Sequence, residues 1–228
     1  MPASNTLCRY ILRTTDADAA RAFYASILGH DRTPIVPLHE QAIARGARPH
    51  WLGQIEVEDV ETSANAFVEL GAQRFGPTNA FPNGRQFAVL RDPCGAMISL
   101  TSEGPADEAP LPVAWHQLHT ADLERSVAVY TKLFGWRSTE RVTHPEHGVF
   151  QHFTWPNDNA DAGAFHDIAG REGRHPHWLF HVRVPSFDRA LEQARAAKCL
   201  VIGPYTLPSG ERVVVIDDPQ GAAIALRG

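Results

Sequence analysis

The chain has 228 residues, enough for one large domain or two small ones. Its composition, 43% hydrophobic and 21% charged, is typical of a globular protein and excludes a disordered chain. The net charge of −5 argues against a nucleic-acid-binding surface, and no apolar run approaches the roughly 18 residues of a membrane span. With three scattered cysteines and no secretory signal at its start, we expect a cytoplasmic protein with reduced thiols.

Apolar periodicity and capping residues predict alternating strands and helices along the first half. The predicted elements are, in order, a strand (Leu7–Thr14), a helix capped by Asp16 or Asp18 and ended by Gly29, a strand (Trp51–Val57), a helix capped by Asp59 and ended by Gly71, and two strands (Arg85–Leu90 and Ala96–Leu100) around the turn Asp92-Pro-Cys-Gly95.

The second half shows the same succession. Its predicted elements are a strand (Trp115–Thr120), a helix (Leu123–Phe134), a strand (His177–Val184), a helix with an apolar stripe from Phe187 to Ala197, and two strands (Val213–Ile216 and Ala222–Leu226) around the turn Asp218-Pro-Gln-Gly221.

The two halves also repeat each other in sequence. Pro49-His-Trp-Leu52 recurs as Pro176-His-Trp-Leu179, and Asp16–Gly29 matches Asp122–Gly135 with Tyr24 falling on Tyr130. We therefore predict two homologous domains, 1–103 and 113–228. The stretch 104–112 between them is rich in proline and acidic residues and is typical of a linker.

The first domain is shorter than the second. About 21 extra residues lie between Gly135 and Pro176, and they include the alternating run Val149–Trp155. We interpret the difference as a β-hairpin that the first domain lacks. We expect its cleft to be incomplete and its role to be structural.

Together these patterns describe four β-α-β-β-β modules, one of them truncated. Helices outside mostly antiparallel sheets give an α+β class, and paired modules can curl a sheet around a cleft lined by alternate strand residues.

The fourfold module, the helix ending Phe-Tyr…Leu-Gly and the Asp-Pro-x-Gly hairpin resemble the vicinal oxygen chelate superfamily, which includes glyoxalase I, bleomycin-resistance proteins and extradiol dioxygenases. Segments such as Trp115-His-Gln-Leu-His-Thr-Ala-Asp and Pro176-His-Trp-Leu179 are similar to a tandem, two-domain subgroup labelled glyoxalase-like. The resemblance covers nearly the whole chain. It specifies the fold and leaves the activity open, because one scaffold hosts many chemistries.

The resemblance implies a divalent metal held by residues of the first and last strands of paired modules. The matching positions here hold Trp115, Leu179 and Ala225 in the second half, and Arg9, Leu52 and Ser99 in the first half. These side chains cannot make a hard-cation site, so we expect no metal at the usual positions and no other cofactor. The alternative is zinc, iron or nickel on relocated histidines.

Nine of the 12 histidines lie from His116 onward, so a chemically active cleft is expected in the second half. By the two-residue period of strands, side chains next to the matched positions face the same cleft. The candidate ligand-binding residues are Trp115, Gln117, His119, His152, His166, His181 and Arg183. His119 and His181 are the best candidates for a catalytic role, which stays unassigned.

Other histidines and two tryptophans are not expected to take part in function. We expect the loop-like His144, His147, His175 and His177 to be solvated, and Trp51 and Trp178 to pack in the core.

Three functions follow. The first is a protein that binds a small molecule in the second-half cleft without the usual metal. The second is a metal-dependent lyase of glyoxalase I type, or an extradiol-type dioxygenase, with a relocated histidine site. The third is an interaction module with vestigial clefts. Neither nucleic acid nor a membrane is an expected partner, and both a monomer and a homodimer are compatible with the sequence.

Overall fold

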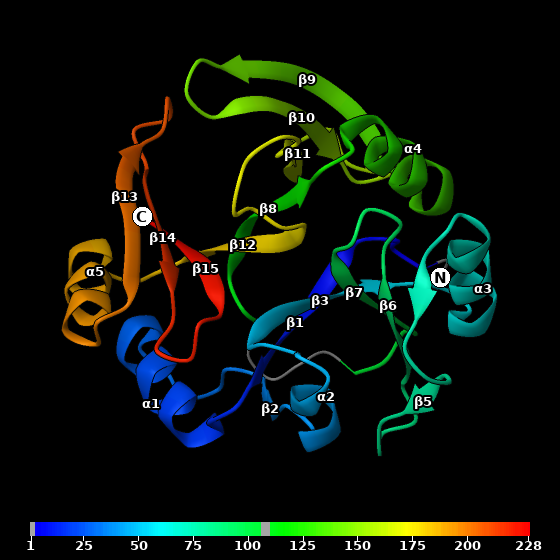
Figure 1. Cartoon of the computed structure of the whole chain (residues 1–228), viewed down its shortest axis with the longest axis horizontal. Coiled ribbons are helices and arrows are strands. Elements are labelled where there is room, and N and C mark those ends of the chain that lie inside the picture. Colours follow the sequence, from blue (N-terminus) through cyan, green and yellow to red (C-terminus); the bar gives the residue numbers. More distant parts are fainter. Residues whose placement is uncertain (1–2, 106–109) are drawn as a thin grey trace. The chain divides into compact units, whose positions relative to one another are not determined.

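The computed structural model describes residues 3–105 and 110–228 (Figure 1). The elements of the first half are β1 (Leu7–Thr14), α1 (Ala17–Leu28), β2 (Ile35–Pro37), α2 (Glu40–Ala44), β3 (His50–Glu56), α3 (Val60–Glu69), β4 (Gln73–Arg74), β5 (Asn79–Ala80), β6 (Gln86–Arg91) and β7 (Met97–Thr101). Those of the second half are β8 (Val113–Thr120), α4 (Leu123–Phe134), β9 (Arg137–His144), β10 (Gly148–Thr154), β11 (Gly163–Asp167), β12 (His177–Arg183), α5 (Phe187–Ala196), β13 (Leu200–Thr206), β14 (Arg212–Asp217) and β15 (Ala223–Arg227).

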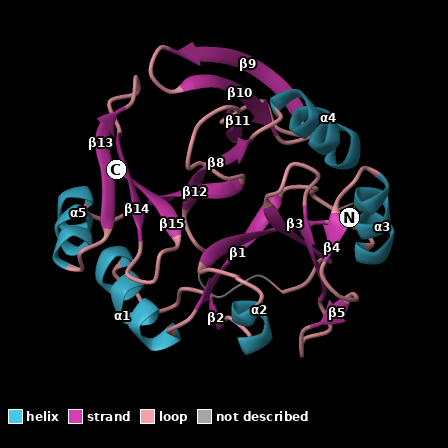
Figure 2. Ribbon diagram, viewed as in Figure 1, coloured by secondary structure: helices cyan, strands magenta, loops and turns pink. Residues whose placement is uncertain are grey.

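Within the described residues, the strands form a seven-stranded sheet and an eight-stranded sheet, accompanied by helices (Figure 2). The first has the order β2-β1-β3-β7-β6-β4, with β5 also paired to β6, and the second has the order β13-β14-β15-β12-β8-β11-β10-β9. The fold is therefore α+β, built from paired β-α-β-β-β modules as predicted.

Contacts group the modules into two compact units that each combine both halves of the sequence. The α3–α4 unit comprises Met1–Arg9, Gly53–Ala106 and His116–Trp178, and the α1–α5 unit comprises Tyr10–Leu52, Asp107–Trp115 and Leu179–Gly228. Each unit is described by itself. The predicted linker, 104–112, includes residues 106–109, which lie outside the described part of the chain.

Aromatic side chains form the interior of the α3–α4 unit. Trp136 stacks on Phe153 with ring centroids 4.8 Å apart, and Phe67 of α3 meets the edge of Tyr130 of α4. The two helices lie side by side there. Helix α4 begins at Asp122, whose side chain accepts from the Arg125 amide, and ends at a left-handed glycine.

The α1–α5 unit is formed in the same way. Helix α1 begins at its cap Asp16 and ends at Gly29, whose φ of 77° is left-handed. It packs against α5, which presents an apolar stripe that starts at Phe187 and includes Ala190 and Leu191.

A hydrogen-bonded Tyr–Asp–Trp trio recurs once in each unit. In the α3–α4 unit, Tyr130 donates its hydroxyl to Asp92 at 3.0 Å and accepts from the indole of Trp178 at 3.4 Å. Burial raises the pKa of Tyr130 well above its usual value, which keeps the hydroxyl protonated and donating. The other oxygen of Asp92 accepts the turn amides of Cys94 and Ala96.

The second trio joins Tyr24, Asp218 and Trp51 in the α1–α5 unit. Tyr24 donates to Asp218 at 3.0 Å and accepts from Trp51 at 3.0 Å. In both trios, the aspartate comes from the opposite half of the sequence. Both tryptophans are buried, as expected. Each Asp-Pro-x-Gly turn is hydrogen-bonded, through its aspartate, to a helix of the other half.

The two halves differ between the first helix and the second long strand. In the second half, β9 and β10 form an antiparallel hairpin, and β11 pairs in parallel with β8. In the first half, the chain there forms the three-residue β2, parallel to β1, and the short helix α2. The sequence patterns did not predict β2, α2, the short strands β4 and β5, or the edge strand β13.

Candidate functional site

Strand pairing in the α3–α4 unit brings several candidate residues onto one face. His119 of β8 lies opposite His166 of β11, and His166 lies opposite Phe150 of β10. One row along, Gln117 lies opposite Ala164, and Ala164 lies opposite His152. Because successive strand residues alternate, both rows share one face of the sheet. We call Gln117, His119, His152 and His166 the histidine face.

The two central imidazoles share a hydrogen bond. The Nδ1 atoms of His119 and His166 lie 3.0 Å apart, and both side chains are buried. His166 Nε2 lies 2.7 Å from the carbonyl of His147 and must donate its proton there. Burial lowers the pKa of His166, so its Nδ1 is bare and accepts the proton of His119 Nδ1.

Gln117 and two flat rings complete this arrangement. The Gln117 amide nitrogen lies 3.1 Å from His119 Nε2, which accepts from it when His119 is neutral. Phe150 stacks on His166 with centroids 4.2 Å apart, and His177 stacks on His119 at 4.5 Å. The result is a neutral chain of hydrogen bonds flanked by planar groups.

His177 is a residue that sequence reasoning placed wrongly. The predicted strand from His177 is confirmed as β12, but His177 was also expected to be solvated. It is instead partly buried, and burial lowers its pKa to about 4. His144 and His175 are exposed, while His147 is partly buried. The Pro-His-Trp-Leu repeat could have indicated that His177 is partly buried, because His177 directly precedes Trp178, a tryptophan predicted to pack in the core.

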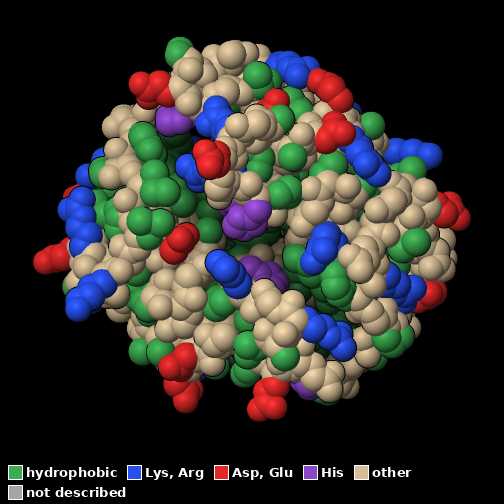
Figure 3. Space-filling view, viewed as in Figure 1, with side chains coloured by type: hydrophobic (Ala, Val, Ile, Leu, Met, Phe, Trp, Pro, Cys, Tyr) green, Lys and Arg blue, Asp and Glu red, His purple; other side chains and the backbone are tan. Residues whose placement is uncertain are grey.

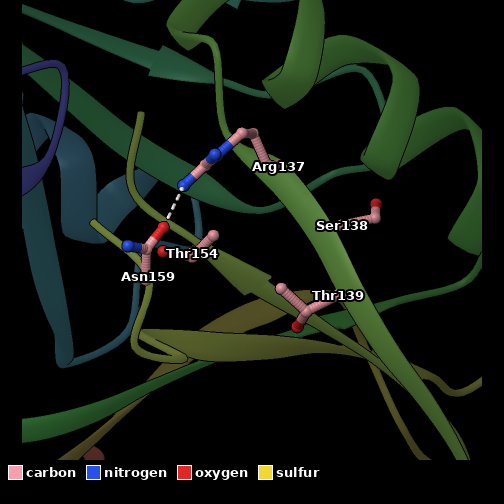
Figure 4. A pocket seen from close by; sticks show the side chains of 5 residues that line it. All are labelled: Arg137, Ser138, Thr139, Thr154 and Asn159. Atoms are coloured by element: carbon pink, nitrogen blue, oxygen red, sulfur yellow. Dashed lines mark hydrogen bonds between the residues drawn. The ribbon is translucent and has the colours of Figure 1, made fainter. Parts of the chain in front are cut away.

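His152 has a carboxylate partner on the same face. Its Nδ1 lies 2.9 Å from Asp161, whose other oxygen accepts from Thr139 at 2.5 Å. Thr139 also lines a pocket of about 230 Å³ together with Arg137, Ser138, Thr154 and Asn159 (Figure 4). The Arg137 guanidinium bonds Asn159 across this pocket at 3.3 Å.

The remaining candidates, Trp115, His181 and Arg183, belong to the α1–α5 unit. His181 is buried on β12 opposite Ala225, and Trp115 is partly buried. Arg183 is exposed and bonds Glu211, which also accepts from Arg227. The sequence patterns did not indicate that Glu211 would be the carboxylate partner of Arg183.

The positions at which the resemblance implies a metal hold side chains that are chemically unsuited to one. Leu179 and Ala225 form a buried apolar cluster with Val213. In the first half, Arg9 donates to the carbonyls of Gly104 and Pro105, and aliphatic or guanidinium groups offer no ligand atoms. The described residues contain no group of three or more His, Cys, Asp or Glu side chains arranged to hold a metal ion.

Charged side chains are scattered over the face of the molecule shown in Figure 3.

Cys8, Cys94 and Cys199 are free thiols. Across the described residues, no helix is long and apolar enough to cross a membrane.

Comparison with known proteins identifies the chain's relatives. The family model "Glyoxalase/Bleomycin resistance protein/Dioxygenase superfamily" matches residues 113–226. The proteins named "Putative glyoxylase CFP32" from Mycobacterium bovis and Mycobacterium tuberculosis are each 26% identical to this chain, over 94% of the chain and 91% of their own length.

Similar solved structures support the fold over the full chain. The 2,3-dioxygenase LapB from a Pseudomonas species has a TM-score of 0.65 at 15% identity, covering 100% of this chain and 93% of its own. The Mn(II)-bound glyoxalase from Novosphingobium aromaticivorans has a TM-score of 0.66 at 12% identity, covering 100% and 83%. Homoprotocatechuate 2,3-dioxygenase from Brevibacterium fuscum, in complex with 3,4-dihydroxyphenylacetate, has a TM-score of 0.67 at 17% identity, covering 100% and 82%.

Proposed function

Because the chain belongs to the glyoxalase/bleomycin resistance protein/dioxygenase superfamily, we propose that it binds a small organic molecule at the histidine face of its second half. Binding does not use a metal at the superfamily's usual positions. The proteins named in the structural comparison include one in complex with a small dihydroxy aromatic acid, which supports a small organic ligand as the class.

The observation that carries this proposal is the shared proton of His119 and His166. A neutral imidazole pair, with one proton fixed by the His147 carbonyl and an amide from Gln117, has defined donor and acceptor positions. Buried polar groups arranged in this way favour a ligand whose hydrogen bonds match them. Both ring nitrogens of His119 are engaged within the face, so we assign ligand contact to Gln117, whose amide oxygen accepts from no described residue.

The apolar cluster of Leu179, Val213 and Ala225 supports binding without the usual metal. A divalent ion needs oxygen or nitrogen ligands, and this cluster supplies neither.

Metal analysis of untagged protein distinguishes metal-free binding of a small molecule from a metal-dependent lyase or dioxygenase with a relocated histidine site. We expect no stoichiometric zinc, iron, nickel or manganese after purification. A stoichiometric ion that is lost in His181→Ala or His119→Ala would instead establish the relocated metal site.

Thermal-shift screening tests ligand binding itself. We expect stabilisation by a member of a panel of aromatic, quinone-like and α-oxo-carbonyl compounds, since a ligand that binds the folded state raises the melting temperature. His166→Phe keeps a ring against Phe150 but removes the shared proton, so the shift should disappear, whereas the exposed His144→Phe should leave it unchanged. No shift with any compound would favour an interaction module.

A further inference from the structure

The first half contains a charged side chain that the chain itself does not neutralise. Arg13 lies on β1 and is partly buried, and burial lowers the pKa of its guanidinium. It makes no hydrogen bond or ion pair with any described residue, unlike Arg183 or Arg227, which share Glu211. A partly buried guanidinium that has no partner among the described residues keeps its donors available for an external acceptor.

A histidine with a fixed tautomer lies in the same unit. His50 begins β3, and its Nδ1 lies 2.8 Å from the carbonyl of Arg48, to which it must donate. Burial lowers the pKa of His50, so the ring is neutral. Its Nε2 is therefore an acceptor, and no described residue donates to it.

Sheet topology and the internal repeat place Arg13 and His50 together. Strands β1 and β3 are neighbours in the seven-stranded sheet, and the charge of Arg13 acts on His50. In the repeat, Arg13 corresponds to His119 and His50 corresponds to His177. That second pair stacks with ring centroids 4.5 Å apart, so the equivalent positions are adjacent.

The chemistry of the two equivalent places differs. His119 and His177 present two imidazoles, whereas the first half presents a guanidinium beside an imidazole. Among the described residues, burial lowers the pKa of Arg13 with no carboxylate acting to raise it, and the charge of Arg13 lowers the pKa of His50.

We propose that Arg13 and His50 form a second ligand site, in the first half, for a small carboxylic acid with a hydroxyl group on the neighbouring carbon. A guanidinium has only donors and binds the two oxygens of a carboxylate in a bidentate manner. The bare Nε2 of His50 requires an O–H donor, which the neighbouring hydroxyl supplies. This site gives the first half a binding role in place of the purely structural one expected from its missing hairpin.

Isothermal titration of the untagged full chain with sodium glycolate and sodium acetate tests this proposal, at pH 7.5 and constant ionic strength. Both anions have a carboxylate, but glycolate alone has the hydroxyl. We expect glycolate to bind about threefold to tenfold more tightly than acetate, the contribution of one neutral hydrogen bond. Arg13→Met should weaken both anions at least tenfold, and His50→Phe should remove the preference for glycolate.

Two controls make the outcome specific. Arg21→Met removes an exposed arginine of α1 that bonds the Asp31 carbonyl, and it should bind glycolate like the wild type. His166→Phe alters the histidine face and should also leave glycolate binding unchanged. Unliganded Arg13→Met should melt at the same temperature as the wild type or above it, because it loses an unpaired charge. Wild-type affinity for glycolate in Arg13→Met, no heat of binding in the wild type, or a lower melting temperature in Arg13→Met would overturn the proposal.

Discussion

Burial decides the protonation state of the histidines in the α3–α4 unit. It lowers the pKa values of His116, His166 and His177, and His116 and His177 reach about 4. At neutral pH these rings are therefore uncharged acceptors and donors whose tautomers are set by backbone carbonyls. A ligand at the histidine face meets fixed dipoles in place of positive charges.

His116 should make the protein sensitive to acid. Its pKa falls from 6.5 in the unfolded chain to about 4 in the folded one, because the ring is buried. As pH decreases below about 6.5, the unfolded chain binds the proton first, so the free energy of unfolding decreases until about pH 4. The shift corresponds to a loss of about 3 kcal/mol.

The test compares urea unfolding at pH 7.5 and pH 4.5 for the wild type and His116→Asn. Asparagine can still donate to the Ala162 carbonyl, the partner of His116 Nδ1 at 2.7 Å, but does not titrate. The variant should lose less stability on acidification than the wild type, and the exposed His175→Asn should behave like the wild type. Equal losses in wild type and His116→Asn would contradict this account.

Strand periodicity predicted some neighbours within the histidine face and not others. Gln117, His119 and His166 were predicted to share a face, and strand register places them there. The stacking of His177 on His119 was missed, because the sequence does not reveal that two strands distant in the chain bring these rings together. Asp161, the partner of His152, comes from the loop before β11 and follows no strand periodicity.

At the scale of elements, the Tyr–Asp–Trp trios connect helices, strands and turns. Asp92 holds the turn between β6 and β7 and accepts from Tyr130 of α4. Tyr130→Phe would leave a buried carboxylate oxygen and the Trp178 indole without their hydroxyl partner. Each unsatisfied buried group costs about 1–3 kcal/mol.

We therefore expect Tyr130→Phe to lower the free energy of unfolding by about 1–3 kcal/mol, and Tyr24→Phe to do the same in the other unit. Tyr205 is 42% exposed, so Tyr205→Phe should change stability by less than about 0.5 kcal/mol. Denaturant unfolding measures all three. A Tyr130→Phe variant as stable as Tyr205→Phe would show that the trio contributes no stability.

Regular elements with caps or strong periodicity were the predictable ones. The expected helix Leu123–Phe134 matches α4 residue for residue, because an aspartate cap and a left-handed glycine define both ends. In contrast, β13 is mostly exposed, with Leu200 and Tyr205 on the surface. Its apolar run 200–202 is only three residues long and is followed by Gly203-Pro204, so no strand pattern develops. Strand β2 has three residues, too few for any pattern.

At the scale of the whole molecule, each compact unit needs elements of both sequence halves. The hairpin turn of the first half contributes Asp92 to α4, and that of the second half contributes Asp218 to α1. The repeat predicted two homologous domains, but it did not indicate this exchange, since pairing within or between repeats satisfies the same local patterns.

This exchange predicts how the second half behaves alone. A fragment of residues 113–228 retains Tyr130, Trp178 and Asp218 but lacks Asp92, the partner of Tyr130. Because the two Asp-Pro-x-Gly turns are equivalent, Asp218 of one copy can replace Asp92 beside Tyr130 of another copy. We therefore expect the fragment to fold as a homodimer with two such trios, which buries the apolar face of α4 that α3 covers in the full chain.

Size-exclusion chromatography with light scattering gives the mass of the fragment, and circular dichroism reports its folding. Asp218→Asn weakens the one acceptor available to Tyr130 in the dimer, so it should raise the dimer's dissociation constant, whereas the exposed Asp188→Asn should not. A folded monomer with a buried Tyr130 would contradict the exchange as the basis of the architecture. It would show that a single half can supply a hydrogen-bond acceptor for its own Tyr130. The two halves would then pair in the full chain only because they are covalently linked.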